Sequence, residues 1–580
     1  MPNFISEDQI EKAAVKLLNE EYGYRKVNCY TADLENLNDK SNRSSKQEVI
    51  FPKILKKQTV QINPTIPENV IDQAIDNLTA RRTTMSPILA NKEVYSLIRD
   101  GIPVQFEGTN GKTEHETVKV IDFNNPKSND FLAVTQLWIK GERYPRRPDI
   151  IIYINGIPLV FIELKNSNVK VQNAYDDNLT NYKHYIPLLF NFNAFCVLSN
   201  ALETRVGSFT SGYEHFFRWL RPNDEAEKVD RSSISEEGTS LERLLHGIFP
   251  KDRLLDYIEN FILYYKDSTK IVAQNHQFLG VNKAIESFKQ RKEKKGKLGV
   301  FWHTQGSGKS FSMIFLARKV FHNFTGNYTF AIITDRDDLD GQIYRNFLDT
   351  NTVTKSEAAR PKNSAQMRDF FSRNKRLVFT LIQKFRYDKE KEYPELSTRD
   401  DIIVIVDEAH RTQYSSLAEN MRKGLPNAQY FAFTGTPILG KGDQLYQGKT
   451  HDWFGGYISQ YNFVQSIDDG ATVPLFYQKR VPEVLIQNVN LSAEFYEILE
   501  DENLDEKAME KLEKEYSSEI QVIKRDDRLD TIAEDMVKHF PSRGYLGKGM
   551  VISVDKFTSV KMYDKVLHYW KEELKNLVGE

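Results

Sequence analysis

Two acidic residues and a lysine stand at the ends of one predicted β-hairpin. The segment 146–167 reads RRPDIIIYINGIPLVFIELKNS, and the Asn-Gly pair at 155–156 is a strong signal for a tight turn between two strands. Asp149 opens the first strand, and Glu163 and Lys165 share one face of the second. Two carboxylates can bind Mg²⁺, and the lysine can orient or deprotonate water beside a scissile phosphate. The pattern predicts a catalytic metal site, with an exposed Glu–Lys pair on a strand edge as the alternative.

The register of this hairpin decides whether the two acids can meet. A regular two-residue turn would pair Asp149 with Ile162 and would leave Glu163 on the opposite face. Both acids share a face only if the loop has three residues or if a β-bulge shifts the register. We therefore predict one of these two irregularities.

A glycine-rich loop follows an apolar strand further along the chain, in LGVFWHTQGSGKSFSM (298–313). Glycines let the backbone wrap a phosphate, and N–H groups at the start of the next helix point at the anion. Lys309 would reach the β- and γ-phosphates and Ser310 would bind Mg²⁺. His303 stands where the full pattern has its first glycine, so an ordinary glycine turn is the alternative. The predicted nucleotide-binding residues are Gly306, Ser307, Gly308, Lys309 and Ser310.

Acidic residues at the end of a second apolar strand support this interpretation. DIIVIVDEAHRT (401–412) places Asp407 and Glu408 at the carboxyl end of a strand, where a parallel sheet carries its ligand-binding groups. Asp407 would hold Mg²⁺ and Glu408 would polarise the attacking water. A solvated charge cluster is the alternative, but it does not explain why a strand, a phosphate loop and an acidic pair occur in this order.

The composition fits a multi-domain globular protein. With 580 residues, 40% of them hydrophobic, the chain is too long for one core, and its net charge of −2 argues against a uniformly basic nucleic-acid binder. Its two cysteines, Cys29 and Cys196, lack metal-ligand spacing. There is no signal segment and no apolar run of membrane-spanning length. We expect a cytoplasmic protein with no membrane association.

The motifs of the second half resemble those of superfamily 2 helicases and translocases. In that family FAFTGTP couples ATP hydrolysis to DNA movement, which assigns this role to Thr434 and Thr436. His410 completes the acidic nucleotide-binding motif. Gln277 would contact the adenine edge as the helicase Q motif does, with a surface glutamine as the alternative. Two further segments match DNA-contacting motifs: IITDRDDLDGQ at 332–342 and VFTLIQKF at 378–385.

The hairpin resembles the PD-(D/E)xK nuclease fold, which suggests further site residues. Glu7, in an amphipathic helix predicted over 6–21, would add an acid, although Glu11 competes with it and a plain acid at a helix N-terminus is the alternative. Arg146 and Arg147 are candidate phosphate contacts, with a solvated basic pair as the alternative.

One helical motif of these nucleases departs from the family pattern. A Gln-x-x-x-Tyr motif is common there, whereas this chain has Asn178-x-x-x-Tyr182, and its Gln172 is three residues from Tyr175. We carry over only Tyr182 to the predicted site.

Taken together, the motifs resemble the restriction (R) subunit of type I restriction–modification enzymes over most of the chain. The phrases that carry this resemblance are RRPDIIIYINGIPLVFIELKN, YIPLLFNFN, WHTQGSGKS, TDRDDLDGQ, DEAHRTQ and FTGTP. The resemblance implies ATP-driven translocation of double-stranded DNA and Mg²⁺-dependent cleavage of unmodified DNA far from the recognition sequence. It also implies methyltransferase and specificity subunits as partners, with S-adenosylmethionine serving only the assembled complex.

The resemblance and the alternation of apolar strands with helices predict an α/β organisation. We expect a PD-(D/E)xK nuclease-like α/β domain over 1–220, a helical linker over 221–270 and a RecA-like parallel-sheet domain over 271–468. Residues 469–580 would begin a second RecA-like domain, with a strand at 549–554. The later helicase motifs are not found in the sequence, so we expect a fragment that cannot translocate DNA alone.

Three other functions compete with this interpretation. A helicase-like repair or RNA-remodelling ATPase would use the N-terminal domain only to bind nucleic acid. A non-enzymatic assembly module would keep degenerate motifs for structure. A type III restriction subunit shares the motor, but in that family the nuclease follows the motor, whereas here the hairpin precedes it.

Overall fold

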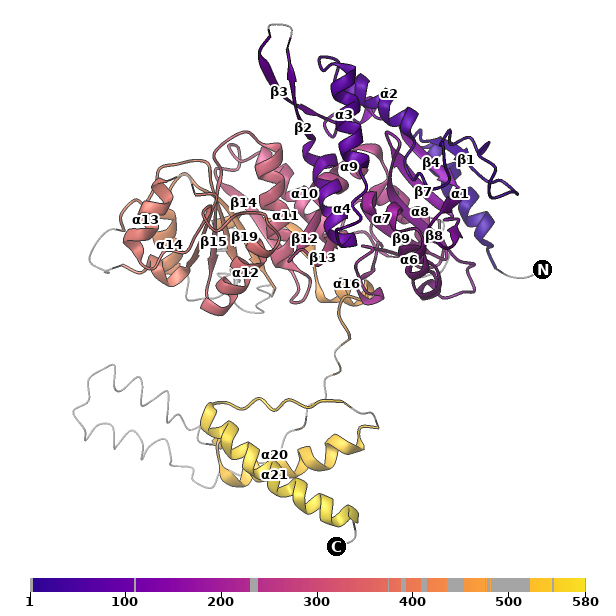
Figure 1. Cartoon of the computed structure of the whole chain (residues 1–580). Helices are drawn as coiled ribbons and strands as arrows, with labels where there is room; N and C mark the ends of the chain where they lie inside the picture. Colours follow the sequence, from indigo (N-terminus) through magenta and orange to yellow (C-terminus); the bar gives the residue numbers. More distant parts are fainter. Residues whose placement is uncertain are drawn as a thin grey trace, which may run out of the picture. The chain divides into compact units, whose positions relative to one another are not determined.

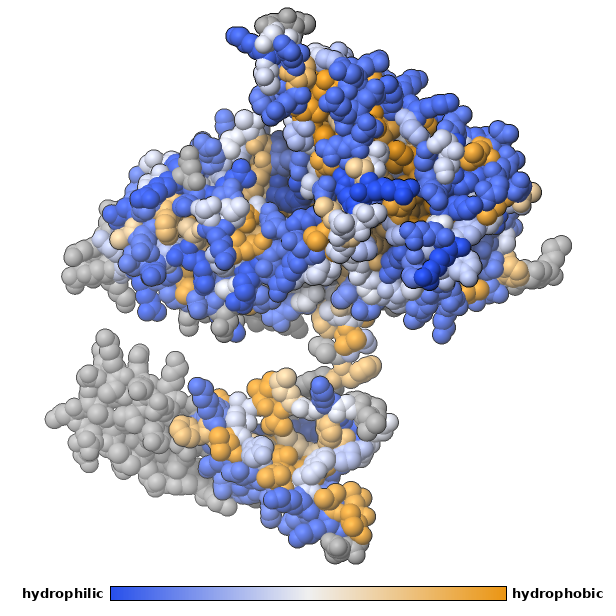
Figure 2. Space-filling model, in the orientation of Figure 1, coloured by the Kyte–Doolittle hydropathy of each residue, from blue (hydrophilic) through white to orange (hydrophobic). Residues whose placement is uncertain are grey.

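Two seven-stranded sheets carry the two predicted sites, and both belong to the first of two structural units (Figure 1). The computed structural model describes residues 4–108, 111–229, 238–373, 375–387, 393–407, 415–435, 453–474, 476, 480, 522–544 and 547–578. The first unit covers residues 1–474 and the second covers 475–580. Figure 2 shows a largely hydrophilic face on the first unit, because most of its apolar side chains are gathered in the cores around the sheets.

The N-terminal sheet mixes parallel and antiparallel pairs. Its strand order is β1 (Arg25–Asn28), β4 (Phe131–Thr135), β7 (Ile150–Ile154), β8 (Ile157–Leu164), β9 (Phe195–Ser199), β10 (Thr204–Gly207) and β11 (Phe217–Arg218). The pairs β1–β4 and β8–β9 are parallel, and the other neighbours are antiparallel. Two small antiparallel hairpins accompany the sheet: β2 (Ile102–Glu107) with β3 (Thr113–Val118), and β5 (Ile139–Lys140) with β6 (Pro145–Arg146).

Helices pack around this sheet. They are α1 (Glu7–Glu20), α2 (Pro52–Ile62), α3 (Glu68–Thr79), α4 (Pro87–Asp100), α5 (Val171–Asn173), a π-helical turn (Ala174–Leu179), α6 (Thr180–Tyr185) and α7 (Pro187–Phe192). The helix predicted over 6–21 is α1. The Ser6 hydroxyl caps it by accepting a hydrogen bond from the Gln9 N–H, and Ile10, Ala14 and Leu18 form its buried stripe.

The β7–β8 hairpin contains the predicted irregularity, which is a β-bulge. The turn has two residues, Asn155 and Gly156, both with positive φ (52° and 80°). Ile150 pairs with Ile162, but the register shifts beyond Ile152, which leaves Leu159 as the extra residue on β8. This shift moves the whole second half of β8 by one position and confirms the register prediction.

The second sheet is entirely parallel. Its strand order is β16 (Ala358–Ala359), β17 (Leu377–Leu381), β15 (Thr329–Thr334), β18 (Ile402–Asp407), β19 (Gln429–Thr434), β14 (Lys297–His303) and β20 (Tyr457–Tyr461). Its helices are α10 (Asn275–Lys289), α11 (Lys309–Asn323), α12 (Asp337–Asp349), α13 (Ser364–Ser372), α14 (Ser415–Gly424) and α16 (Phe463–Asp468).

Both faces of this sheet are buried. On β15, Phe330 and Ile332 enter one hydrophobic core while Ala331 and Ile333 enter another. The first of these cores continues without a break into the N-terminal domain. The prediction of a parallel sheet covered on both faces is confirmed.

The segment between the two sheets is partly β-structure, in contrast to the predicted helical linker over 221–270. It contains α8 (Ser240–Ile248) and α9 (Lys251–Asn260), followed by an antiparallel hairpin of β12 (Ile262–Tyr265) and β13 (Thr269–Val272). The hairpin is anchored to the N-terminal domain, because the Tyr264 hydroxyl and the Lys270 ammonium both donate to the Asn91 side-chain carbonyl, at 2.6 and 3.0 Å. Most of the aromatic run at 261–265 thus forms strand β12, whose first three residues are buried, while Phe261 caps the end of α9.

The described part of the second unit consists of two packed helices, α20 (Asp526–Ser542) and α21 (Lys556–Val578), with Leu529, Ala533 and Met562 between them. The strand predicted at 549–554 is wrong. These residues are described but pair with no other strand, and an extended segment forms a strand only with a hydrogen-bonded neighbour. Among all described residues, none of the helices has the length and apolar character that a membrane span requires.

The tight turn of the carboxylate hairpin gives a stability prediction. A Cβ on Gly156 would lie 2.6 Å from the Phe51 carbonyl oxygen at the start of α2. We expect Gly156→Ala to destabilise the fold by more than ~2 kcal/mol, because a positive φ alone costs ~1–2 kcal/mol and the clash with backbone adds to it. Gly470→Ala is the matched control, since Gly470 also has a positive φ (73°) but an added Cβ meets nothing within 4 Å. Thermal unfolding measures the loss of stability in each variant. An equal decrease in unfolding temperature for both variants would contradict the role assigned to the clash.

Candidate active sites

The bulged hairpin brings the two predicted acids together. Asp149 directly precedes β7 and Glu163 lies near the end of β8, so continuing the Ile150–Ile162 pair by one residue places them opposite each other. The Asp149 carboxylate accepts a hydrogen bond from the Leu164 N–H at 2.8 Å. Lys165 begins the following segment, and its ammonium lies 3.7 Å from Glu163 Oε1 and donates to the Leu164 carbonyl at 3.1 Å. The three predicted catalytic residues therefore form one cluster.

Glu163 is the most deeply buried member of this cluster, with 1% of its surface exposed. Its Oε1 accepts hydrogen bonds from the Asn178 amide and from the Tyr182 hydroxyl, the latter at 3.4 Å. Its Oε2 is buried and has no hydrogen-bond partner among the described residues. Burial and the neighbouring Asp149 carboxylate raise the pKa of Glu163 well above its usual range, although Lys165 opposes them.

The pKa of Asp149 is also raised, but by less than that of Glu163. Burial raises its pKa to about 6, although the hydrogen bond from Leu164 and the charge of Lys165 act in the opposite direction. Two buried carboxyl groups side by side are costly as anions in this environment. A bound cation would remove that cost, which is the electrostatic condition of a metal site.

The donor set fits a magnesium ion. Mg²⁺ is usually bound through one or two carboxylates, with water and phosphate oxygens completing its octahedron. Asp149 and Glu163 supply the two carboxylates, and the buried Glu163 Oε2 is the oxygen that lacks a partner in the described structure. No cluster of three or more His, Cys, Asp or Glu side chains suited to a metal occurs among the described residues, as expected if solvent and substrate provide the remaining ligands.

A cavity of about 590 Å³ opens beside Asp149 and contains the candidate acids of α1. Glu7 and Glu11 both line it, one helical turn apart. The Gln136 amide donates to Glu11 at 2.5 Å, and burial raises the pKa of Glu11. The structure therefore places both acids at the site and does not choose between them.

Two residues of the helical segment after β8 contact Glu163. Tyr182, carried over from the family motif, touches Glu163, and its hydroxyl also lies 3.3 Å from the Arg147 carbonyl oxygen. Asn178, which was left out of the predicted site, is a direct partner of Glu163. The signal for it was the four-residue spacing to Tyr182, which places both side chains on one side of the helical segment.

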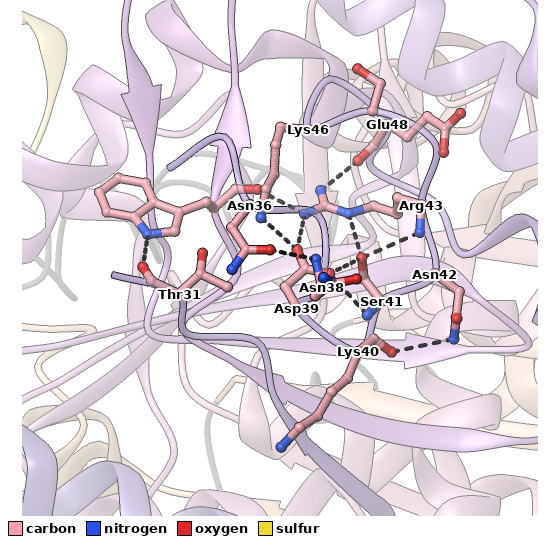
Figure 3. A network of polar contacts seen from close by, with 12 residues as sticks. Thr31, Asn36, Asn38, Asp39, Lys40, Ser41, Asn42, Arg43, Lys46 and Glu48 are labelled. Atoms are coloured by element: carbon pink, nitrogen blue, oxygen red, sulfur yellow. Dashed lines mark hydrogen bonds and ion pairs between the residues drawn. The ribbon is translucent and has the colours of Figure 1, made fainter. Parts of the chain in front are cut away.

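A polar loop borders the same cavity and is held by buried charges (Figure 3). Asp39 accepts hydrogen bonds from Lys46 at 2.8 Å and from Arg43 at 3.0 Å, and all three side chains are at most 3% exposed. Arg43 also donates to the carbonyl oxygens of Glu48 and Trp138. Burial alone would raise the pKa of Asp39, but these hydrogen bonds outweigh it and hold the pKa at about 2. The polar segment at 38–48 is thus held in place next to Asp149.

The glycine-rich loop follows β14 and leads into α11 with the expected geometry. Gly306 and Gly308 have φ of 82° and 77°, and a Cβ at Gly306 would meet open space, which leaves room for a phosphate. Lys309 is the first residue of α11, and its ammonium donates to the His303 carbonyl at 3.2 Å. Ser310 follows it in the first turn of the helix.

Buried polar residues support this loop from behind. Ser307 is 1% exposed. Its hydroxyl donates a hydrogen bond to the Thr304 carbonyl, and its own carbonyl oxygen lies within hydrogen-bond distance of the His276 ring. Gln277, predicted to contact adenine, donates to the Gly308 carbonyl at 3.1 Å and accepts from the Gln274 N–H. The structure thus gives Gln277 a role in holding the loop, and its contact with adenine stays a prediction.

The carboxyl ends of neighbouring strands meet at the loop. Asp407 ends β18 and Thr434 ends β19, and β19 lies between β18 and β14. A Cβ at Gly435 would lie 3.1 Å from the Lys309 ammonium, so the threonine motif adjoins the phosphate loop. Glu408, His410 and Thr436 lie outside the described residues.

These features define a mixed α/β domain joined to a RecA-like parallel-sheet domain, and each of them is similar to a known protein family. Residues 4–215 match the family described as type I restriction enzyme R protein N terminus, and residues 276–508 match the SWI2/SNF2 ATPase family. The chain is therefore an R-subunit-like protein with an ATPase domain.

Individual relatives agree with these family matches. The type I restriction enzyme HindI endonuclease subunit of Haemophilus influenzae is 34% identical over 97% of this chain and 54% of its own length. A Methanocaldococcus jannaschii protein, named as the MjaIXP endonuclease subunit of a type I restriction enzyme, is 32% identical over 96% of this chain and 54% of its own length. The chain thus spans about half the length of these relatives.

A solved structure with a related description was also found. It is a fragment assigned to an HsdR subunit of a type I restriction enzyme from Vibrio vulnificus, with 15% identity, a TM-score of 0.31, and coverage of 75% of this chain and 66% of that one.

The buried charges beside the cavity give a stability prediction. We expect Asp39→Asn to lower the free energy of unfolding by about 3–5 kcal/mol, because it leaves two buried cations without their carboxylate. Chemical denaturation at pH 7 measures the change. Asp33→Asn, at an exposed aspartate of the preceding segment, is the control and should change stability by less than ~0.5 kcal/mol. A loss below 1 kcal/mol for Asp39→Asn would show that the buried cluster does not hold this loop.

Proposed function

We propose that the chain provides the DNA-cleaving and ATP-driven activities of a type I restriction endonuclease subunit. The observation that carries the proposal is the cluster of Asp149, Glu163 and Lys165 on a bulged hairpin, followed in the same chain by a phosphate loop on an all-parallel sheet. The relatives named above are type I endonuclease subunits, which supports the proposal.

The nuclease chemistry follows from the positions of these side chains. Asp149 and Glu163 would hold Mg²⁺, which when bound polarises the scissile phosphate and lowers the pKa of water. Asn178 and Tyr182 hold Glu163 Oε1, which fixes the direction of its second, buried oxygen. Lys165, partly exposed beside Glu163, would orient the attacking water and stabilise negative charge on the phosphate.

The motor chemistry uses the carboxyl ends of β14, β18 and β19. Lys309 would exchange its hydrogen bond to the His303 carbonyl for the β- and γ-phosphates of ATP. Ser310 and Asp407 would hold Mg²⁺, Glu408 would polarise water, and Thr434 and Thr436 would couple hydrolysis to movement of DNA. Gly435 adjoins Lys309, so a change at the γ-phosphate can reach the threonine motif directly.

The wider assignments belong to the same proposal. The substrate would be unmodified double-stranded DNA, and the partners would be methyltransferase and specificity subunits, with S-adenosylmethionine serving the assembled complex. The proposed domains are 1–220 for cleavage, 221–270 as the connection and 271–468 for ATP hydrolysis, with 469–580 beginning a second RecA-like domain.

Two variants should separate the two activities. We expect Lys165→Ala to reduce Mg²⁺-dependent cutting of supercoiled plasmid by about 10²–10⁴-fold while ATP binding is unchanged. Lys309→Ala should weaken binding of a fluorescent ATP analogue at least about 10-fold and leave binding of metal at the nuclease site intact. Both are measured on the chain with its cognate methyltransferase and specificity subunits.

Two exposed lysines serve as controls, Lys170 shortly after Lys165 in the sequence and Lys292 before β14, in the same domain as Lys309. Lys170→Ala and Lys292→Ala should behave as wild type, because both side chains are exposed. Cutting that survives both Asp149→Asn and Lys165→Ala would exclude the nuclease assignment. Unchanged nucleotide binding in Lys309→Ala would favour a non-enzymatic assembly role.

The raised pKa of Asp149 predicts an unusual pH dependence of stability. The folded protein favours the protonated carboxyl group, so this residue destabilises the metal-free fold as the pH rises from about 4 through 6. We expect Asp149→Asn to stabilise the metal-free protein by about 2–3 kcal/mol at pH 8 and to have no effect below pH 4. Denaturation in EDTA at both pH values measures this. Added Mg²⁺ should make the wild type more stable than Asp149→Asn at pH 8, because only the wild type keeps both carboxylates that bind the ion.

A further inference from the structure

Two arginine–aromatic stacks lie on either side of the segment that leads into Asp149. Arg146 ends β6 and Arg147 follows it, and their guanidinium groups lie over different sets of aromatic rings. Each guanidinium lies over aromatic rings, and each stack ends in a tyrosine that is 55% exposed. These exposed tyrosines, Tyr30 and Tyr144, have no part in the cleavage chemistry described above.

The first stack lies at the cavity itself. The Arg147 guanidinium is 5.2 Å from the ring centre of Tyr30 and 5.0 Å from that of Trp138, and Tyr30 and Arg147 both line the cavity with Asp149. The backbone N–H of Tyr30 donates to the Asn28 side chain at 2.9 Å, and the Trp138 indole donates to the Thr31 carbonyl at 3.2 Å. The Tyr30 ring is therefore held in place while half of its surface stays open to solvent.

The second stack lies on the β5–β6 hairpin. The Arg146 guanidinium is 4.3 Å from the ring centre of Tyr185 and 6.0 Å from that of Tyr144. Tyr144 also meets Tyr185 edge to face at 5.1 Å. Gly141 fixes the hairpin on the end of α6, because a Cβ there would overlap the Tyr185 carbonyl oxygen.

The cavity beside the first stack is small, and five of its lining side chains are acidic. Its volume of about 590 Å³ falls in the range of small-ligand sites, ~300–1,000 Å³. Its acidic lining consists of Glu7, Asp8, Glu11, Asp39 and Asp149. Lys40 and Arg147 also line the cavity, and the exposed Tyr30 ring at its rim offers a further contact to a bound strand. An aromatic ring can stack only on a base face that no neighbouring base covers.

We propose that Tyr30, with Tyr144 as a second platform, stacks on unpaired bases, so that the nuclease site takes a locally single-stranded DNA strand rather than an intact duplex. The proposal rests on the nuclease function proposed above and names its substrate form. Arg146 and Arg147 then have two roles, because they hold the rings and place positive charge beside the strand's phosphates. A duplex delivered to this site would have to open locally before it is cut.

The test measures binding without cleavage. The purified chain, without ATP and with Ca²⁺ in place of Mg²⁺, is titrated against a fluorescein-labelled 20-nucleotide single strand, the matching duplex and the same duplex with a central four-nucleotide gap. We expect the single strand and the gapped duplex to bind more tightly than the intact duplex. Tyr30→Ala should weaken binding of both by roughly 5- to 100-fold and leave duplex binding unchanged. Tyr30→Phe keeps the ring and should bind as wild type.

Tyr213→Ala is the matched control, because Tyr213 also stacks under an arginine (Arg205, 4.9 Å) but does not line the cavity. Any of three results would overturn the proposal. The intact duplex and the single strand could bind with equal affinity, or Tyr30→Ala and Tyr213→Ala could lose equal affinity for the single strand. Tyr30→Ala could also weaken duplex binding as much as it weakens single-strand binding. The failure of this proposal can be told apart from failure of the nuclease assignment. If plasmid cutting depends on Lys165 but not on Tyr30, the nuclease assignment stands and the stacking role of Tyr30 is rejected. If single-strand binding depends on the Tyr30 ring but no plasmid is cut, the stacking role stands and the nuclease assignment is rejected.

Discussion

The β-bulge at Leu159 is the constraint on which the N-terminal site depends. Without the extra residue, the tight Asn-Gly turn would place Asp149 and Glu163 on opposite faces of the sheet. With it, two carboxyl groups lie side by side where water is largely excluded. The raised pKa values of both acids are the electrostatic cost of this arrangement, and a bound cation is the simplest way to offset it.

Much of the surrounding structure keeps these two carboxyl groups in position. The Leu164 N–H holds Asp149, and Asn178 and Tyr182 hold one oxygen of Glu163. The Asn155 side chain ties the turn to the Asp130 N–H and to the Val120 carbonyl. The two carboxylates are thus placed by backbone groups and by residues of the neighbouring helical segment, which fits the proposed metal site, whose ligands have to be fixed before a metal binds.

The connection between the two sheets makes them parts of one packed body. A single hydrophobic core extends from the N-terminal sheet to one face of the parallel sheet. The Lys270 ammonium is fully buried there, donates to Asn91 and to the Asn193 carbonyl, and has its pKa lowered to about 7 by burial. A lysine at this depth with only neutral partners is tolerated because two carbonyl oxygens and the rings of Tyr95, Tyr264 and Phe209 surround it.

The sequence by itself determined the chemistry-bearing residues and the order of the two domains. Apolar strands ending in Gly306–Ser310, Asp407 and Thr434 specify a parallel sheet with its ligand groups at one edge, because strand polarity fixes where such residues collect. Even the need for an irregular hairpin followed from counting residues between the two acids. Three outcomes came from the folded chain alone: which irregularity occurs, that Asn178 joins the site, and that residues 262–265 form a strand while residues 549–554 do not. These outcomes depend on contacts between distant segments, whose packing decides what the local pattern leaves open.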